Sequence, residues 1–112
     1  MEPGIFFFDK DIERSKLLSQ RLQDSFKISK VTSDLKECID SIHNETCKIL
    51  FLGRYDDSMM IIETLKTAEK KGAHVEFFDI IDRDDKDYHE KMTKYLREKV
   101  IESLNELDEE VY

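Results

Sequence analysis

The sequence predicts one α/β domain over residues 1–112, with a parallel four-stranded sheet between two layers of helices and a long C-terminal helix. Three observations lead to this fold class. Short apolar segments alternate with helical patterns along the whole chain, the third segment is almost continuously apolar, and 112 residues make one domain. Strands that alternate with helices at this spacing are joined by right-handed crossovers, and the predicted strand order is 2-1-3-4.

The first strand is expected at Ile5–Phe8, where four large apolar residues follow one another. The first helix is expected to begin after Asp11, because its carboxylate is suited to cap a helix N-terminus and Glu13 favours the helix dipole. Apolar residues then recur at near-helical spacing, at Ile12, Leu18, Leu22 and Phe26.

The second strand is expected at Lys27–Thr32, where polar residues alternate with Ile28 and Val31 as in a half-exposed strand. Ser33 or Asp34 is expected to cap the next helix. The side chains of that helix that are expected to face inward are Leu35, Cys38, Ile39 and Ile42.

The third strand is expected at Cys47–Leu52, and Gly53 ends this apolar run. A run of this kind is typical of a central strand that is covered on both faces. The following helix is expected to be capped by Asp57 or Ser58 and to end at Gly72, because glycine readily adopts the left-handed conformation of a helix C-terminus.

The fourth strand is expected at His74–Ile81, at an edge of the sheet, and a helix over residues 83–110 should follow it. An apolar edge strand needs a cover, which the terminal helix can supply. The apolar stripe of that helix is longer than one sheet needs, so we expect it to bind a second subunit or another protein as well. The interaction residues expected on this strand and helix are Phe78, Ile80, Met92, Leu96, Val100 and Leu104.

Composition narrows the classes of partner. Acidic side chains outnumber basic ones by 26 to 18, and no Lys/Arg block suggests nucleic-acid binding. No apolar run is long enough to cross a membrane. Cys38 and Cys47 form no CxxC motif, and the three histidines have no metal-ligand spacing, so we expect a reduced, cytoplasmic protein without zinc.

Asp9, Lys10 and Asp11 directly follow the first strand. Ligands and catalytic groups of open α/β sheets gather outside the carboxyl ends of the strands, so this position is the first candidate site. The simplest interpretation of the two carboxylates is that they end a strand and cap a helix. Asp56 and Asp57, shortly after the third strand, are better explained by a turn and a helix cap than by chemistry.

In this arrangement residues Gly4–Asp82 resemble the receiver domain of two-component response regulators, a flavodoxin-like fold. The segment from Ile5 to Asp11 resembles its first strand and acidic cluster, Ile49–Gly53 its third strand and phospho-acceptor, and Val75–Ile81 its fourth strand. The departures are that the metal-binding acid pair reads Asp9-Lys10, that Gly53 replaces the phosphorylated aspartate, and that no fifth strand carries the partner lysine.

The resemblance implies a degenerate pseudo-receiver that is not phosphorylated at the usual site and acts by protein-protein interaction, without catalysis or a cofactor. Its vestigial acidic pocket would consist of Asp9, Lys10, Asp11 and Gly53. Glycine cannot be a carboxylate nucleophile. Lys10 is expected to place a fixed positive charge beside Asp9, where a receiver domain holds its metal.

A second resemblance keeps an enzyme open as the alternative. Asp9-Lys10-Asp11 after an apolar strand is similar to the DxD start of haloacid-dehalogenase-like phosphatases. That resemblance implies Asp9 as nucleophile, Asp11 as general acid/base and Mg²⁺ as cofactor. Asp79, Asp82 and Asp84 would supply further metal ligands, and Lys70 or Lys71 the family's lysine. The Ser/Thr expected after the second motif strand is again Gly53.

The function predicted from the sequence is therefore a signalling or scaffold module that forms a homodimer through the fourth strand or the terminal helix. A third hypothesis is that the chain is the first part of a longer protein, with the terminal helix as a connector to a further domain.

Overall fold

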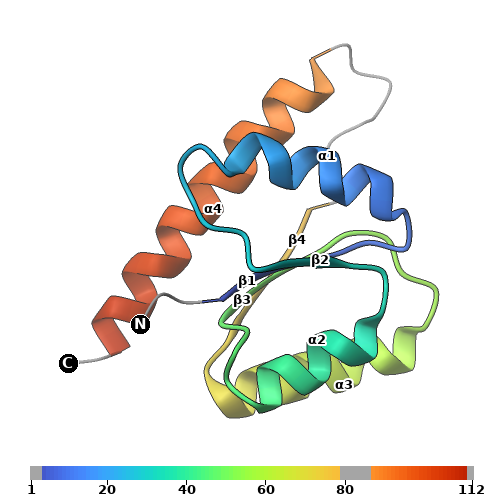
Figure 1. Ribbon diagram of the computed structural model, residues 1–112. Helices are drawn as coiled ribbons and strands as arrows, with labels where there is room; N and C mark the ends of the chain where they lie inside the picture. The colour runs from blue at the N-terminus through green and yellow to red at the C-terminus, as the bar shows by residue number, and fades with distance from the viewer. Residues whose placement is uncertain (1–3, 79–86, 111–112) are drawn as a thin grey trace.

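The computed structural model of the chain describes residues 4–78 and 87–110, without the side chains of residues 89 and 108–110. The predicted fold class is confirmed: four parallel strands in the order β2-β1-β3-β4 lie between helices (Figure 1). The elements along the chain are β1 (Ile5–Phe8), α1 (Ile12–Leu22), β2 (Lys30–Thr32), α2 (Leu35–His43), β3 (Ile49–Leu52), α3 (Ser58–Lys71), β4 (His74–Phe77) and α4 (Tyr88–Glu110).

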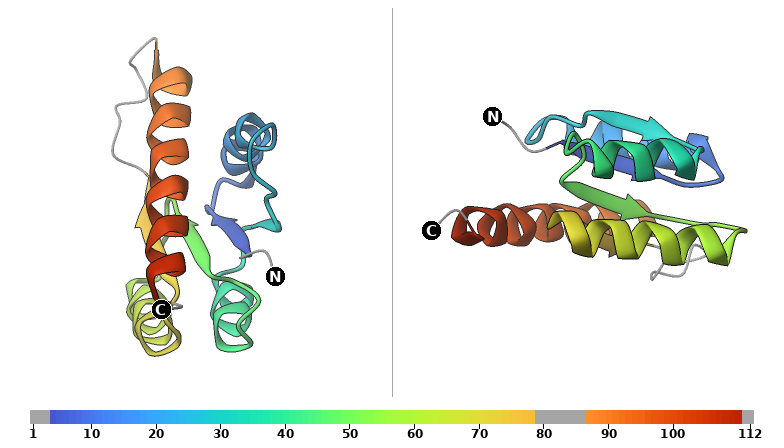
Figure 2. Two further views of the ribbon diagram at one scale, coloured as in Figure 1. Left: turned by 90° about the vertical axis from the view of Figure 1, so that its left-hand side faces the viewer. Right: turned by 90° about the horizontal axis from the view of Figure 1, so that it is seen from below.

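The helices form two layers, with α1 and α4 on one face of the sheet and α2 and α3 on the other (Figure 1; Figure 2). The side chains of β1 and β3 are buried throughout, because these central strands are covered on both faces. They alternate between the two layers: Phe7 and Phe51 belong to one core and Phe8 and Leu52 to the other. No helix among the described residues is both long enough and apolar enough to cross a membrane.

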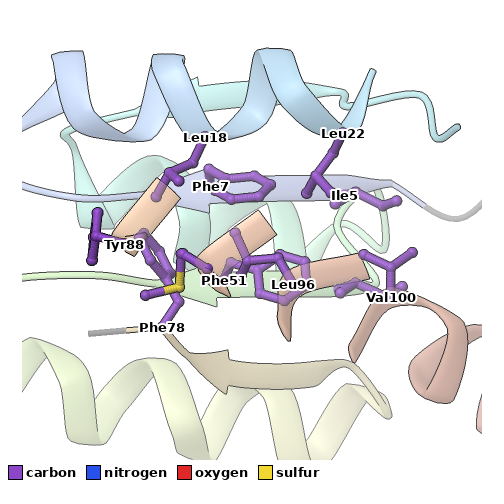
Figure 3. Close-up of a cluster of buried hydrophobic side chains, with 11 residues drawn as sticks. Ile5, Phe7, Leu18, Leu22, Phe51, Phe78, Tyr88, Leu96 and Val100 are labelled. Atoms are coloured by element: carbon purple, nitrogen blue, oxygen red, sulfur yellow. The ribbon is translucent and has the colours of Figure 1, made fainter. Parts of the chain in front are cut away.

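The core between the sheet and helices α1 and α4 is the larger of the two and is rich in aromatic side chains (Figure 3). The rings of Phe7 and Phe51 lie 4.9 Å apart, and those of Phe7 and Phe78 lie 5.7 Å apart. Helix α4 contributes Tyr88, Met92, Leu96 and Val100 to this core. The core on the other face includes Phe6, Phe8, Cys38, Cys47, Leu50 and Leu52.

Three helix starts are fixed by the aspartates that the sequence offers. The side chains of Asp11, Asp34 and Asp57 accept hydrogen bonds from the backbone N–H groups of the first turns of α1, α2 and α3. Helix α3 ends at Gly72, whose φ of 72° is the left-handed value predicted for this position.

Strands β2 and β3 are shorter than predicted. β2 begins at Lys30 instead of Lys27, because the chain comes alongside β1 only at Ser29, whose N–H donates to the carbonyl of Ile5. β3 begins at Ile49, two residues later than predicted. The described part of the fourth strand is His74–Phe77; residues 79–81 and the expected start of the last helix at residues 83–86 lie outside the described residues.

The structure corrects the prediction that the terminal stripe is a partner-binding surface. Phe78, Met92, Leu96 and Val100 have no exposed surface, and Leu104 is partly buried against the same core. The reason is topological. Of the three crossover helices only α1 covers this face, and α4 is needed as its second cover. The remaining predicted interaction residue, Ile80, lies outside the described residues.

The cost of replacing a phenylalanine should therefore depend on whether its ring is buried, as in β3, or exposed, as at the end of β4. Phe51→Ala removes a fully buried ring and should lower the free energy of unfolding by about 3–5 kcal/mol. Phe77→Ala, the matched control, removes a ring that is 38% exposed and should cost about 1 kcal/mol. Urea denaturation of both variants checks this, and equal losses would contradict the described core.

Candidate functional site

The carboxyl ends of the strands converge on Asp9 and Gly53. The backbone N–H of Asp9 donates to the carbonyl of Thr32 at the end of β2, and that of Gly53 donates to the carbonyl of Phe8 at the end of β1. The N–H of Phe78, just after β4, donates to the carbonyl of Leu52. The edge where the sequence predicts a site is therefore formed by all four strands.

Asp9 is fully buried, and both of its carboxylate oxygens are engaged. Oδ1 accepts a hydrogen bond of 2.8 Å from the backbone N–H of Asp11, and Oδ2 accepts one of 3.0 Å from Nη1 of Arg14. Burial raises the pKa of Asp9, against the lowering effects of the Asp11 N–H and the Arg14 charge. In this arrangement no oxygen of Asp9 faces solvent.

Arg14 is the residue that the sequence interpretation missed. Its side chain is only 8% exposed, its Nε donates to the hydroxyl of Tyr88 at 2.9 Å, and its guanidinium lies 5.1 Å from the centre of the Phe78 ring. The cation thus joins the end of β1 to the end of β4 and the start of α4. A signal was available, because an arginine in the first turn of a helix is unfavourable for the helix dipole and needs another reason to be there.

The position of Lys10 corrects the prediction that this residue neutralises Asp9. Its Nζ lies 2.7 Å from Oδ1 of Asp56, and both side chains are largely exposed. Arg14 already neutralises Asp9 from inside the domain, and the long lysine side chain keeps its charge in water. Of the predicted acidic pocket, Asp9 and Gly53 are in contact, Asp11 caps α1, and Lys10 lies outside.

Gly53 is a steric requirement of this site. A Cβ atom built at Gly53 would lie 2.3 Å from Oδ2 of Asp9 and 2.7 Å from Cζ of Phe78. Both neighbours are buried and held in place, so neither can move aside easily. The space that an acceptor side chain would need is already filled by Asp9 and Phe78.

The residues of the phosphatase resemblance are dispersed. Lys70 and Lys71 lie in the last turn of α3, at the opposite edge of the sheet from Asp9, because α3 runs from the carboxyl end of β3 to the amino end of β4. Asp79, Asp82 and Asp84 lie outside the described residues. Among the residues that are described, no three His, Cys, Asp or Glu side chains form a group that could hold a metal ion.

A shallow depression of about 320 Å³ lies beside the carboxyl ends of β1 and β3. From β1 the chain continues to β2 on one side of the sheet, and from β3 it continues to β4 on the other, and ligands of such sheets usually bind at this point. It is lined by Phe8, Lys10, Ser33, Asp34, Leu35, Tyr55, Asp56, Asp57 and Met60. The carboxylates of Asp34 and Asp57 occupy the N-termini of α2 and α3. Since these helix ends would otherwise attract an anion, the arrangement disfavours a phosphate-bearing ligand.

The exposed apolar side chains gather elsewhere. Seven large hydrophobic side chains are exposed in the described part of the chain, and five of them belong to the segment from the end of β3 to the end of β4. We call these five the α3 surface: Tyr55, Met59, Ile62, Leu65 and Phe77. The rings of Tyr55 and Phe77 lie 6.4 Å apart, and the other three recur every third residue along α3.

Comparison with known proteins supports the fold. The sequence matches no protein-family model, and no curated protein matches it. The structure is similar to the solution NMR structure of a de novo designed protein with a Rossmann 2x3 fold. The TM-score is 0.68 at 18% sequence identity, over 90% of this chain and 91% of the designed one. This likeness shows a Rossmann-like α/β architecture.

The crowding around Gly53 can be measured. Gly53→Ala should lower the free energy of unfolding by about 1–3 kcal/mol, because the added methyl group must displace buried side chains. In an Asp9→Ala background the same change should cost about 1 kcal/mol less, since two of the three close atoms belong to Asp9. Additive costs in this double-mutant cycle, measured by urea denaturation, would contradict the contact.

The raised pKa of Asp9 predicts the sign of a pH dependence. The folded state binds the proton of Asp9 more tightly than the unfolded state does, so the stability that Asp9 contributes is complete below its ordinary pKa of 3.8 and falls as pH rises through the folded value. The stability of the wild type relative to Asp9→Asn should therefore decrease as pH rises from about 3. Urea denaturation of both proteins across this range checks the sign, and the opposite slope would mean that Arg14 outweighs burial.

Proposed function

We propose that this chain is a non-catalytic, receiver-like module that acts in the cytoplasm through protein-protein interaction and is not phosphorylated at the acceptor position. The observation that carries the proposal is the α3 surface, which holds five of the seven exposed large apolar side chains among the described residues. They form two groups of neighbours, Tyr55 with Phe77, and Met59, Ile62 and Leu65 along α3. The acidic site at the carboxyl ends of the strands, in contrast, is filled by the chain's own side chains. Two buried, free cysteines, Cys38 and Cys47, are consistent with a reducing compartment.

The proposal that the chain is non-catalytic is supported by the surroundings of Asp9 at the carboxyl ends of the strands. A phosphoryl acceptor must present a carboxylate oxygen to the phosphorus atom, with Mg²⁺ to neutralise the transferred oxygens. Asp9 is buried, and its oxygens are bound by Arg14 and by the backbone of Asp11. Arg14 provides a permanent positive charge next to the carboxylate, so the charge balance is achieved within the chain.

The proposal that the chain binds another protein is supported by the α3 surface. Met59 is 75% exposed and Ile62 is 46% exposed, on a helix whose inward side is already satisfied by Ile61, Thr64 and Ala68. Single exposed apolar side chains are ordinary on protein surfaces, but contiguous ones mark places where another molecule binds. Aromatic residues and methionine, both present here, are enriched at such interfaces.

The proposal is tested by adding Mg²⁺ and beryllium fluoride, which imitates a phosphoryl group on aspartate. We expect the melting temperature to stay unchanged and no bound-fluoride signal to appear in ¹⁹F NMR, because binding to the native state would raise the melting temperature. The matched control is Asp9→Asn, which should respond in the same way as the wild type.

A rise in melting temperature that Asp9→Asn abolishes would overturn the proposal, because Asp9 would then be reachable by a phosphoryl group. Mg²⁺-dependent hydrolysis of an aryl phosphate that is lost in both Asp9→Asn and Asp11→Asn would do the same and would favour the phosphatase alternative.

A further inference from the structure

We infer that the partner of the α3 surface is a second copy of this chain, bound so that the two α3 helices pack antiparallel about a two-fold axis. The inference rests on the proposed function and names the partner of its surface. A two-fold contact uses the same patch on both subunits, so the patch must be complementary to itself.

The apolar side chains of α3 meet this requirement. Met59, Ile62 and Leu65 recur every third residue, with Ile62 in the middle. Residues three apart on a helix are neighbours on its surface. If the two-fold axis passes beside Ile62, the two copies of Ile62 face each other, and Met59 of each copy faces Leu65 of the other.

The charges along α3 favour the antiparallel over the parallel arrangement. The helix starts behind two acids, Asp56, which pairs with Lys10, and Asp57, which caps the helix. Glu63 lies near its middle, and its second half carries Lys66, Lys70 and Lys71 with one acid, Glu69. An antiparallel pair places the acidic start of each helix beside the basic end of the other, and the helix dipoles also oppose each other favourably. A parallel pair would place like charges together.

The edge of the sheet at β4 is less suited than α3 to bind a second copy. The carbonyl of Phe77, the last residue of the edge strand β4, accepts a hydrogen bond of 3.3 Å from the hydroxyl of Tyr95 on α4. The long terminal helix thereby occupies part of the edge that another strand would use. The rings of Phe77 and its neighbour Tyr55 stay exposed.

The oligomeric state tests the inference, and Ile62→Asp is the decisive variant. Sedimentation equilibrium at concentrations up to about 1 mM, the weak end of specific association, should give the wild type a mass approaching twice 13.3 kDa. Ile62→Asp should remain a monomer, because the axis would bring two carboxylates together. The matched control is Ile101→Asp, since Ile101 is 49% exposed, lies on α4 and should leave the dimer intact.

A charge exchange tests the antiparallel geometry. Lys66→Glu should weaken the dimer at least about fivefold, because it places a carboxylate beside the acidic start of the other copy's helix. Adding Ser58→Lys should restore most of the affinity, because an axis beside Ile62 brings position 58 of one copy opposite position 66 of the other. Circular dichroism melts should show that all variants stay folded, since the substituted side chains are exposed.

A wild-type monomer at every concentration would overturn the inference, as would a dimer that Ile62→Asp leaves unchanged or one that Ile101→Asp dissociates. A dimer that the charge exchange does not rescue would overturn the antiparallel arrangement. None of these masses depends on phosphoryl chemistry. The proposed function fails instead if beryllium fluoride binds, whatever the mass, so the two failures are distinguishable.

Discussion

The buried ion pair between Asp9 and Arg14 is the constraint on which the carboxyl edge of the sheet depends. A buried carboxylate is tolerated only when it is neutralised and hydrogen-bonded, and Arg14 does both while its guanidinium packs against Phe78 and Tyr88. Because Asp9 is held beside Gly53, no larger residue fits after β3. One arginine thus explains why the edge is closed, why glycine is needed, and how α4 is anchored to β1.

Much of the fold could be predicted because its signals are local. Apolar runs located the four strands, and aspartates and Gly72 located the helix ends, since caps act within a few residues. The candidate site was predicted only in part. The sequence identified Asp9 and Gly53, but it assigned the neutralising charge to Lys10, the adjacent residue, when the cation that lies against Asp9 comes from one turn into α1.

The same limit explains the misplaced interaction surface. The stripe of α4 has the pattern of a binding helix, and only the three-dimensional arrangement shows that one face of the sheet has no other second cover. On α3 the buried residues are Ile61, Thr64 and Ala68, whereas the apolar residues Met59, Ile62 and Leu65 lie on the exposed side of the same helix. A pattern along one helix predicts which residues are apolar but does not predict which element will lie on them.

The placement of α4 also determines the order in which the domain can be completed. The two central strands pair residues far apart in sequence, as Ile5 does with Ile49, so the ends of a long chain segment must meet before the sheet exists. Helix α1 then covers only part of the face that holds Phe7, Phe51 and Phe78, and the rest of the cover comes with α4. A nascent chain that ends before α4 therefore exposes part of an aromatic sheet face, and exposed apolar surface of this kind favours aggregation.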